Sequence, residues 1–164
     1  RDTGFAVQLR SADNSVTCYR SWSVLNSLGV DVREDNERMP FSLVGASIAR
    51  LRLETDGWSG MGGALRLCCD DEKRGELKLL RLLACEQVGS LCTIVRPMLR
   101  YITEKTPNTL SHARLLDDML RFRFDNSRQR VKKDWAWSYY HVKQIGAHKA
   151  QDAASEHSRT GLED

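Results

Sequence analysis

The apolar residues between positions 75 and 102 recur at intervals of three and four, in the stretch GELKLLRLLACEQVGSLCTIVRPMLRYI. Because an α-helix turns once every 3.6 residues, this spacing places the apolar side chains on one face of a helix. Leu91, Val95, Met98 and Ile102 belong to one such face. A helix with an apolar face must bury it against another element. The stretch therefore constrains the chain to a packed set of amphipathic helices.

Helical periodicity recurs in most other segments, and no segment is typical of a ladder of strands. We predict an all-α fold of two small helical bundles packed into one compact helical protein. The bundles comprise residues 1–73 and 74–145, and a polar tail follows at residues 146–164. No apolar run approaches the ~18 residues of a membrane span, so we predict no membrane contact. The chain starts at Arg1 and not at a methionine, and we expect that upstream residues are missing.

Local signals indicate where several helices begin and end. Gly29 follows an apolar segment and is expected at the C-terminal cap of a short helix. The glycines of GMGGALR are expected to form a loop that enters a helix near Ala64. Ser90 is expected to cap the N-terminus of the helix with the 91–102 apolar face. Pro97 should bend that helix, because proline lacks a backbone N–H.

The five cysteines are an odd number, and Cys68 and Cys69 are adjacent. Such a set is a poor disulfide framework and favours a reducing compartment, so we predict a cytoplasmic protein. Neither the cysteines nor the four histidines have the spacing of a zinc site. We predict no metal and no other cofactor.

No catalytic arrangement can be identified from the spacing of the residues. The glycines of GMGGALR are not followed by the Lys and Ser/Thr of a nucleotide P-loop. Asp117 and Asp118 are neighbours on a predicted helix, so their side chains point about 100° apart and do not converge. No Ser/His/Asp or Cys/His arrangement stands out. We therefore predict that the chain is not an enzyme.

Positive charge is concentrated in one part of the chain. Residues 74–133 contain 13 lysines and arginines against six acidic residues, a net charge of +7, whereas the whole chain carries +3. The remainder is therefore acidic, at −4. This asymmetry indicates a polyanionic partner, although a merely solvated basic surface would show the same pattern.

Pairs of cationic residues lie beside the apolar faces of four predicted helices, and not opposite them. The pairs are Arg50 with Arg52, Lys78 with Arg81, Arg96 with Arg100, and Lys132 with Lys133. In the last of these helices the expected buried face is Val131, Trp135, Tyr139 and Val142, with Lys132 and Lys133 outside it. Such side chains reach phosphates but not base edges, so the pattern predicts a groove for a nucleic-acid backbone. The alternative is a helical protein-interaction module that docks acidic protein partners. Trp58 and Trp137 lie outside the predicted apolar faces and could contact either a base or a protein.

Six segments resemble, in the same order and spacing, the CasB family, which forms the small subunit of Cascade, the type I-E CRISPR surveillance complex. The resemblance covers roughly residues 4–142. The segments are FAVQLRSADNSVTCYRSW, ERMPFSLVGASIARL, GMGGALRLC, LLRLLACEQVGSLCTIVRPMLRYI, SHARLLDDMLRF and VKKDWAWSYY.

This resemblance implies an all-helical protein of two small bundles without catalytic activity of its own. It implies three kinds of protein partner: the crRNA-bearing Cascade backbone subunits, the large subunit and a second copy of the chain. Small subunits of this family hold the target strand and the displaced strand of the R-loop through basic residues. Base pairing with the guide supplies the sequence specificity.

Carried over residue by residue, the family's basic nucleic-acid-facing positions fall on Arg10, Arg38, Lys78, Arg96 and Lys132. The chain departs from the family pattern at three places. Ser11 stands where a second arginine is usual, Gly63 replaces a loop arginine that Arg66 could substitute one turn later, and Asp134 occupies a position that is commonly basic. The complete predicted nucleic-acid-binding set is Arg10, Arg38, Arg66, Lys78, Arg81, Arg96, Arg100, Lys132 and Lys133.

Overall fold

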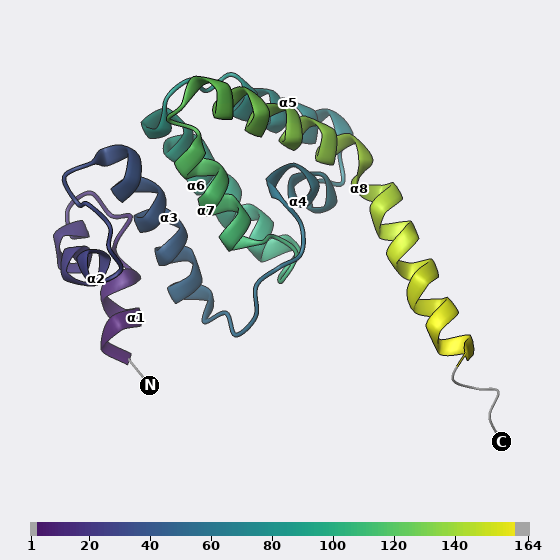
Figure 1. Ribbon diagram of the computed structural model, residues 1–164, viewed down its shortest axis with the longest axis horizontal. Helices are drawn as coiled ribbons and strands as arrows, with labels where there is room; N and C mark the ends of the chain where they lie inside the picture. Colours follow the sequence, from purple (N-terminus) through teal and green to yellow (C-terminus); the bar gives the residue numbers. More distant parts are fainter. Residues whose placement is uncertain (1–2, 160–164) are drawn as a thin grey trace.

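The computed structural model describes residues 3–159, and the side chains of residues 4–142. Within that range the regular elements are helices, and pairing between extended segments is limited to one isolated bridge between Ser59 and Leu110. The all-α prediction is confirmed. In chain order the elements are α1 (Thr3–Leu9), the 3-10 helix η1 (Cys18–Ser21), α2 (Trp22–Ser27), α3 (Asp35–Leu51), α4 (Met61–Cys68), α5 (Glu72–Leu83), α6 (Val88–Lys105), α7 (His112–Arg121) and α8 (Asp125–Arg159) (Figure 1).

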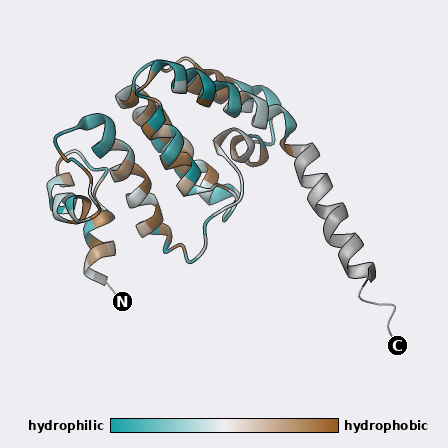
Figure 2. Ribbon diagram, in the orientation of Figure 1, coloured by the Kyte–Doolittle hydropathy of each residue, from teal (hydrophilic) through white to brown (hydrophobic). Residues whose placement is uncertain are grey.

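The buried apolar side chains form two clusters. The main core unites α4, α5, α6, α7 and α8 with Leu43 and Val44 of α3. The N-terminal cluster packs α1, α2 and the segments that follow them against Ala46 and Ala49, also of α3. Helix α3 therefore lies between the clusters and contributes to both (Figure 1). Figure 2 shows apolar and polar residues alternating around the same helices, as expected for amphipathic elements.

The two strongest apolar patterns are confirmed. In α6 the predicted face is buried through Leu91, Val95 and Ile102, and in α8 it is buried through Trp135 and Tyr139. Each fully buried side chain of this size stabilises the fold by about 1.5–3 kcal/mol. Gly29, which follows α2, has a φ of 82°, so the predicted helix end is also confirmed. No helix in the described part of the chain has the length and apolar character needed to cross a bilayer.

Helices α4 and α8 approach each other closely because Gly62 has no side chain. A Cβ atom at Gly62 would lie only 1.9 Å from the carbonyl oxygen of Trp135. The prediction of a loop before a helix near Ala64 was wrong, because α4 begins at Met61 and includes the glycine pair. Glycine costs a helix about 1 kcal/mol relative to alanine. Here the packing of α4 on α8 requires it.

Two further predictions, the start of α6 and the exposure of Lys132, were wrong because of tertiary packing. Helix α6 begins at Val88 and not after Ser90, because Val88 is 2% exposed and belongs to the main core. Lys132, predicted to lie outside the buried face, is only 8% exposed, and its ammonium group pairs with Glu86.

The predicted tail is helical from residue 146 to 159, while residues 160–164 lie outside the described residues.

The division into two bundles at residue 73 stays a prediction. That boundary falls inside α5, and α4, which was assigned to the N-terminal bundle, packs on α8 within the main core.

The start of α7 is a hydrogen-bonded corner that joins three segments. Asp56 accepts hydrogen bonds from the backbone N–H groups of His112 (2.7 Å) and Ala113 (3.1 Å) and from the hydroxyl of Ser111 (2.8 Å). The His112 ring places Nε2 3.1 Å from the hydroxyl of Ser47 on α3, and Nδ1 3.5 Å from Asp56. Burial lowers the pKa of His112 below its ordinary value, although the Asp56 carboxylate opposes the shift.

We predict that Gly62→Ala destabilises the protein. The new methyl group would collide with the backbone of α8, which cannot rotate away, and we expect the free energy of unfolding to fall by about 3 kcal/mol. Urea denaturation followed by circular dichroism measures the change. Gly89→Ala is the matched control, because a Cβ at Gly89 has no neighbour within 4 Å; it should be neutral or raise stability by about 0.5 kcal/mol. Equal stability of the two variants would contradict the close approach.

We predict that His112 makes stability depend on pH below about 6.5, the ordinary histidine pKa. Because its folded-state pKa is lowered, the unfolded chain binds a proton more readily. The free energy of unfolding should therefore decrease as the pH falls through the ordinary histidine pKa. His112→Gln should flatten this dependence, whereas His141→Gln should retain it. Denaturant titrations of the three proteins across this range test the prediction, and it fails if His112→Gln keeps the wild-type slope.

Candidate nucleic-acid interface

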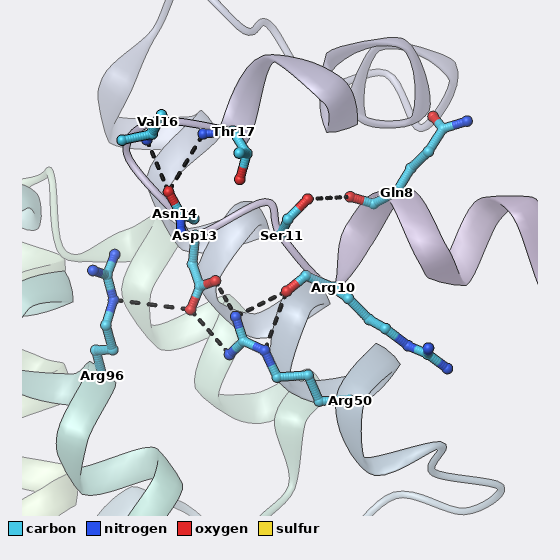
Figure 3. Close-up of polar contacts among 9 residues, drawn as sticks. All are labelled: Gln8, Arg10, Ser11, Asp13, Asn14, Val16, Thr17, Arg50 and Arg96. Atoms are coloured by element: carbon cyan, nitrogen blue, oxygen red, sulfur yellow. Dashed lines mark hydrogen bonds and ion pairs between the residues drawn. The ribbon is translucent and has the colours of Figure 1, made fainter.

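One buried carboxylate fastens the loop after α1 onto two helices. The Asp13 side chain is 6% exposed and pairs with Arg50 of α3 and with Nε of Arg96 of α6, the latter at 3.9 Å. Arg50 also donates to the carbonyl of Arg10 through Nε (3.1 Å) and Nη2 (2.9 Å). Figure 3 shows the carboxylate between the two guanidinium groups. Asp13 thus joins the N-terminal loop, α3 and α6.

The next residue, Asn14, gives the loop its shape. Its side-chain oxygen accepts hydrogen bonds from the backbone N–H groups of Val16 (2.9 Å) and Thr17 (3.4 Å) (Figure 3). Its carbonyl accepts one from the backbone N–H of Cys18 (2.8 Å). Asparagine favours such turns because its short side chain can bond to the backbone two residues later. The turn reverses the chain directly after Asp13 and leads it into η1.

Two cavities share Asp13 and Arg96 in their walls. The larger, of about 470 Å³, is also lined by Arg38, and the smaller, of about 180 Å³, by Arg50 and Arg100. We call the four arginines 38, 50, 96 and 100 the arginine groove. The structure thus brings together three residues of the predicted nucleic-acid-binding set, Arg38, Arg96 and Arg100. Arg50, which belongs to the predicted cationic pairs but not to that set, joins them.

Two rigid helices position the guanidinium groups of the arginine groove. Arg96 and Arg100 are four residues apart, so they share one exposed flank of α6. Arg38 of α3 pairs with Asp35 one turn earlier. Besides Asp13, two further carboxylates, Asp35 and Glu104, line the same cavities and offset part of the positive charge. The groove is therefore a set of held arginines with a small positive excess.

Two further predicted residues lie on α5, beside α6. The ammonium group of Lys78 lies 5.0 Å from the centre of the Tyr101 ring of α6, a favourable cation–π distance. Arg81, one turn later on α5, is exposed. The contact with Tyr101 places the basic flank of α5 next to α6. Lys133 is exposed on α8, outside both cavities.

The remaining predicted residues make contacts within the protein. The Arg66 side chain is 14% exposed, lies 3.8 Å from Glu72 and covers the Tyr139 ring. Lys132 is held by Glu86, as described above. Arg10 donates from Nε to the Ala49 carbonyl at 3.3 Å. Burial and pairing leave Arg66 and Lys132 little charge to offer a phosphate, and neither lines the arginine groove.

The structure assembles one chemical arrangement that spacing along the sequence did not reveal. Ser47, His112 and Asp56 stand in the order of a hydrolase triad, although they are distant in sequence. Ser47 lies inside α3 and is 8% exposed, so the neighbouring amides are engaged in the helix and not available to an oxyanion. The geometry fits a structural link between α3 and α7.

The structure also bears on the adjacent aspartates and on a possible metal site. Asp118 accepts the indole N–H of Trp135 at 2.8 Å, and burial raises its pKa, whereas Asp117 pairs with Arg121 at 2.9 Å. The adjacent carboxylates thus diverge, as predicted. Within the described residues, no three His, Cys, Asp or Glu side chains are grouped to hold a metal ion.

The cysteines differ sharply in their exposure. Cys18 is half-buried and lines the larger cavity of the arginine groove, whereas the other four cysteines are buried. Burial raises the pKa of Cys92 to about 12 and that of Cys68 to about 12. All five are free thiols.

Comparisons with known proteins agree with this architecture. The model of the family described as CRISPR-associated protein Cse2 matches residues 7–140. A Cse2-family CRISPR-associated protein from Thermus thermophilus has a similar structure, with a TM-score of 0.65 and 21% identity over 84% of this chain and 86% of that chain. CasB from Thermobifida fusca has a TM-score of 0.59 and 14% identity over 83% of each chain. No curated protein matches the chain significantly.

We predict that Asp13→Asn destabilises the protein by about 2 kcal/mol. The substitution keeps the size of the side chain but removes the charge that holds Arg50 and Arg96. We expect the loss of stability to be smaller than that for a fully buried ion pair, because Arg50 is 42% exposed and water can hydrate it. Chemical denaturation gives the free energies. Asp117→Asn breaks an exposed pair and should change stability by less than about 0.5 kcal/mol. A loss at Asp117 as large as that at Asp13 would contradict the special role of Asp13.

Proposed function

Because the chain belongs to the CRISPR-associated Cse2 family, we propose that it is the non-catalytic small subunit of a Cascade complex and stabilises the R-loop through a basic helical surface. The observation that carries the nucleic-acid part of this proposal is the arginine groove. Four guanidinium groups from two packed helices line adjoining cavities there.

The chemistry of the groove suits a sugar–phosphate backbone. Guanidinium groups bind phosphate oxygens through paired hydrogen bonds, and arginine remains charged at any physiological pH. Arg96 and Arg100 project from the flank of α6, and Arg38 and Arg50 lie near opposite ends of α3, so no single helix end presents the set to a duplex groove. Such arginines can bind phosphates without reading base edges. Lys78 and Arg81 extend the cationic surface along α5.

The acidic residues of the groove support this role. Asp13 holds Arg50 and Arg96 before a strand arrives, so binding does not have to order these long side chains. The same carboxylates reduce the positive excess, which limits binding to unrelated nucleic acid. A nucleic-acid backbone presents several phosphates at once, and these compete with the carboxylates for the arginines.

In the proposed complex the small subunit contacts the crRNA-bearing backbone subunits, the large subunit and a second copy of itself. The target strand and the displaced strand are the proposed nucleic-acid partners, and guide pairing supplies the sequence recognition. The absence of catalysis is part of the proposal. It is supported by the burial of Ser47 and by the divergence of Asp117 and Asp118.

A second candidate function is the docking of acidic protein partners. The observation that favours it lies on α5, where Leu77 is 60% exposed and Leu80 is 52% exposed, beside the exposed Arg81. Apolar side chains mixed with arginine are typical of protein interfaces. Such a face would lose partner binding on charge reversal without any effect on DNA capture.

We predict that Arg96→Glu with Arg100→Glu weakens DNA binding at least about tenfold and lowers its salt dependence. Each lost phosphate contact should reduce the logarithmic salt slope by about 0.7 on single-stranded DNA. Fluorescence anisotropy with labelled single-stranded and duplex DNA, titrated with salt, measures both quantities. Arg123→Glu is the control, because Arg123 is exposed but lines neither cavity.

The outcomes of this experiment separate the two candidates. Loss of binding in the double variant with retention in Arg123→Glu supports the arginine groove. Equal, salt-dependent binding by all three proteins would overturn it. If the wild type itself does not bind, docking of acidic proteins becomes the better explanation of the basic surface.

A further inference from the structure

A further cavity, with a different balance of charge, lies where the start of α4 meets α8. It has a volume of about 370 Å³, and we call it the tryptophan cleft. Two partly exposed rings line it, Trp58 at 43% exposure and Trp137 at 57%. Trp135 and Val142, both nearly fully buried, contribute its apolar lining. The cleft shares no lining residue with the arginine groove.

The charged groups of the tryptophan cleft are two carboxylates and one guanidinium. Asp118 already accepts the Trp135 indole N–H, and Arg114 donates from Nη1 to the Trp58 carbonyl at 3.4 Å. Asp134 is exposed at the wall, and no ion pair or hydrogen bond to its carboxylate is found among the described residues. The cleft therefore has one carboxylate in excess, which disfavours phosphate and favours a cation.

The Trp137 ring and the backbone at Trp58 are held by neighbouring groups before any ligand arrives. Trp137 stacks on His141, with ring centres 4.5 Å apart and planes at 14°, and His141 donates from Nδ1 to the Trp137 carbonyl at 2.7 Å. On the other wall, the backbone N–H groups of Trp58 and Ser59 donate to the Thr109 carbonyl. His141 does not line the cleft, whereas Trp137 does. A fixed aromatic wall binds a flat cation at low entropic cost.

We propose that the tryptophan cleft binds an arginine side chain of a partner protein. A guanidinium group stacks on an indole ring and pairs with a carboxylate through two parallel hydrogen bonds, so Trp58, Trp137 and Asp134 together match it better than they match lysine. A nucleic-acid strand would bring phosphates toward Asp134 and Asp118. The charge of the cleft therefore assigns the two tryptophans to a protein partner and not to a base.

The test uses N-acetyl-arginine amide as the probe and N-acetyl-citrulline amide as its neutral isostere. The full chain is titrated with each, and the indole N–H signals are followed in nitrogen–proton NMR spectra. Trp58→Phe and Trp137→Phe assign the two signals of interest among the four tryptophans. We expect saturable shifts of both signals with the arginine compound and none with the citrulline compound.

Asp134→Asn provides the second arm. Because Asp134 is exposed, the variant should fold normally, and we expect it to weaken binding of the arginine compound about threefold or more. Asp117→Asn changes an exposed acidic residue outside the cleft and should leave the affinity for the arginine compound unchanged.

Three outcomes would overturn the proposal: no shift with the arginine compound, equal shifts with the citrulline compound, or shifts of the same two signals with oligothymidine, which would assign the cleft to nucleic acid. None of these results depends on the arginine groove. Failure of the cleft and failure of the proposed DNA binding are therefore distinguishable.

Discussion

The candidate interface depends on the Asp13 carboxylate. Two arginines on neighbouring helices would repel each other if they faced one cavity without a counter-charge. Asp13 supplies that charge from a loop that belongs to neither helix, and Asn14 shapes the turn that delivers it. The same contact fastens the N-terminal cluster to α3 and α6. The N-terminal segment therefore contributes directly to the arginine groove.

The main core depends on a different constraint, the missing side chain at Gly62. It lets α8 lie directly on α4. The cleft lined by Trp58, Trp135 and Trp137 borders this contact. The arginine groove is built around α3 and α6, and the tryptophan cleft around α4 and α8. The proposed anion-binding groove and the proposed cation-binding cleft therefore lie on different helices.

The sequence predicts those parts of the fold that local periodicity determines. The apolar faces of α6 and α8 could be identified because their residues repeat at helical spacing. Three arginines predicted to contact nucleic acid also lie together, because Arg96 lines one cavity with Arg38 and the other with Arg100. Contacts distant in sequence were not predictable. Arg50 meets Asp13 37 positions away, and Lys132 meets Glu86 46 positions away. Nothing near these residues marks their partners, so the exposure of Lys132 was predicted wrongly.

The uneven burial of the five thiols has a practical consequence. A maleimide reacts with thiolates that solvent can reach, and Cys18 is the half-buried thiol while Cys68, Cys69, Cys85 and Cys92 are enclosed. Under native conditions one fluorophore should therefore attach beside Arg38 and Arg96 without any engineered mutation. The sequence thus provides its own labelling site in the wall of the larger cavity, where a bound strand would change the surroundings of the dye.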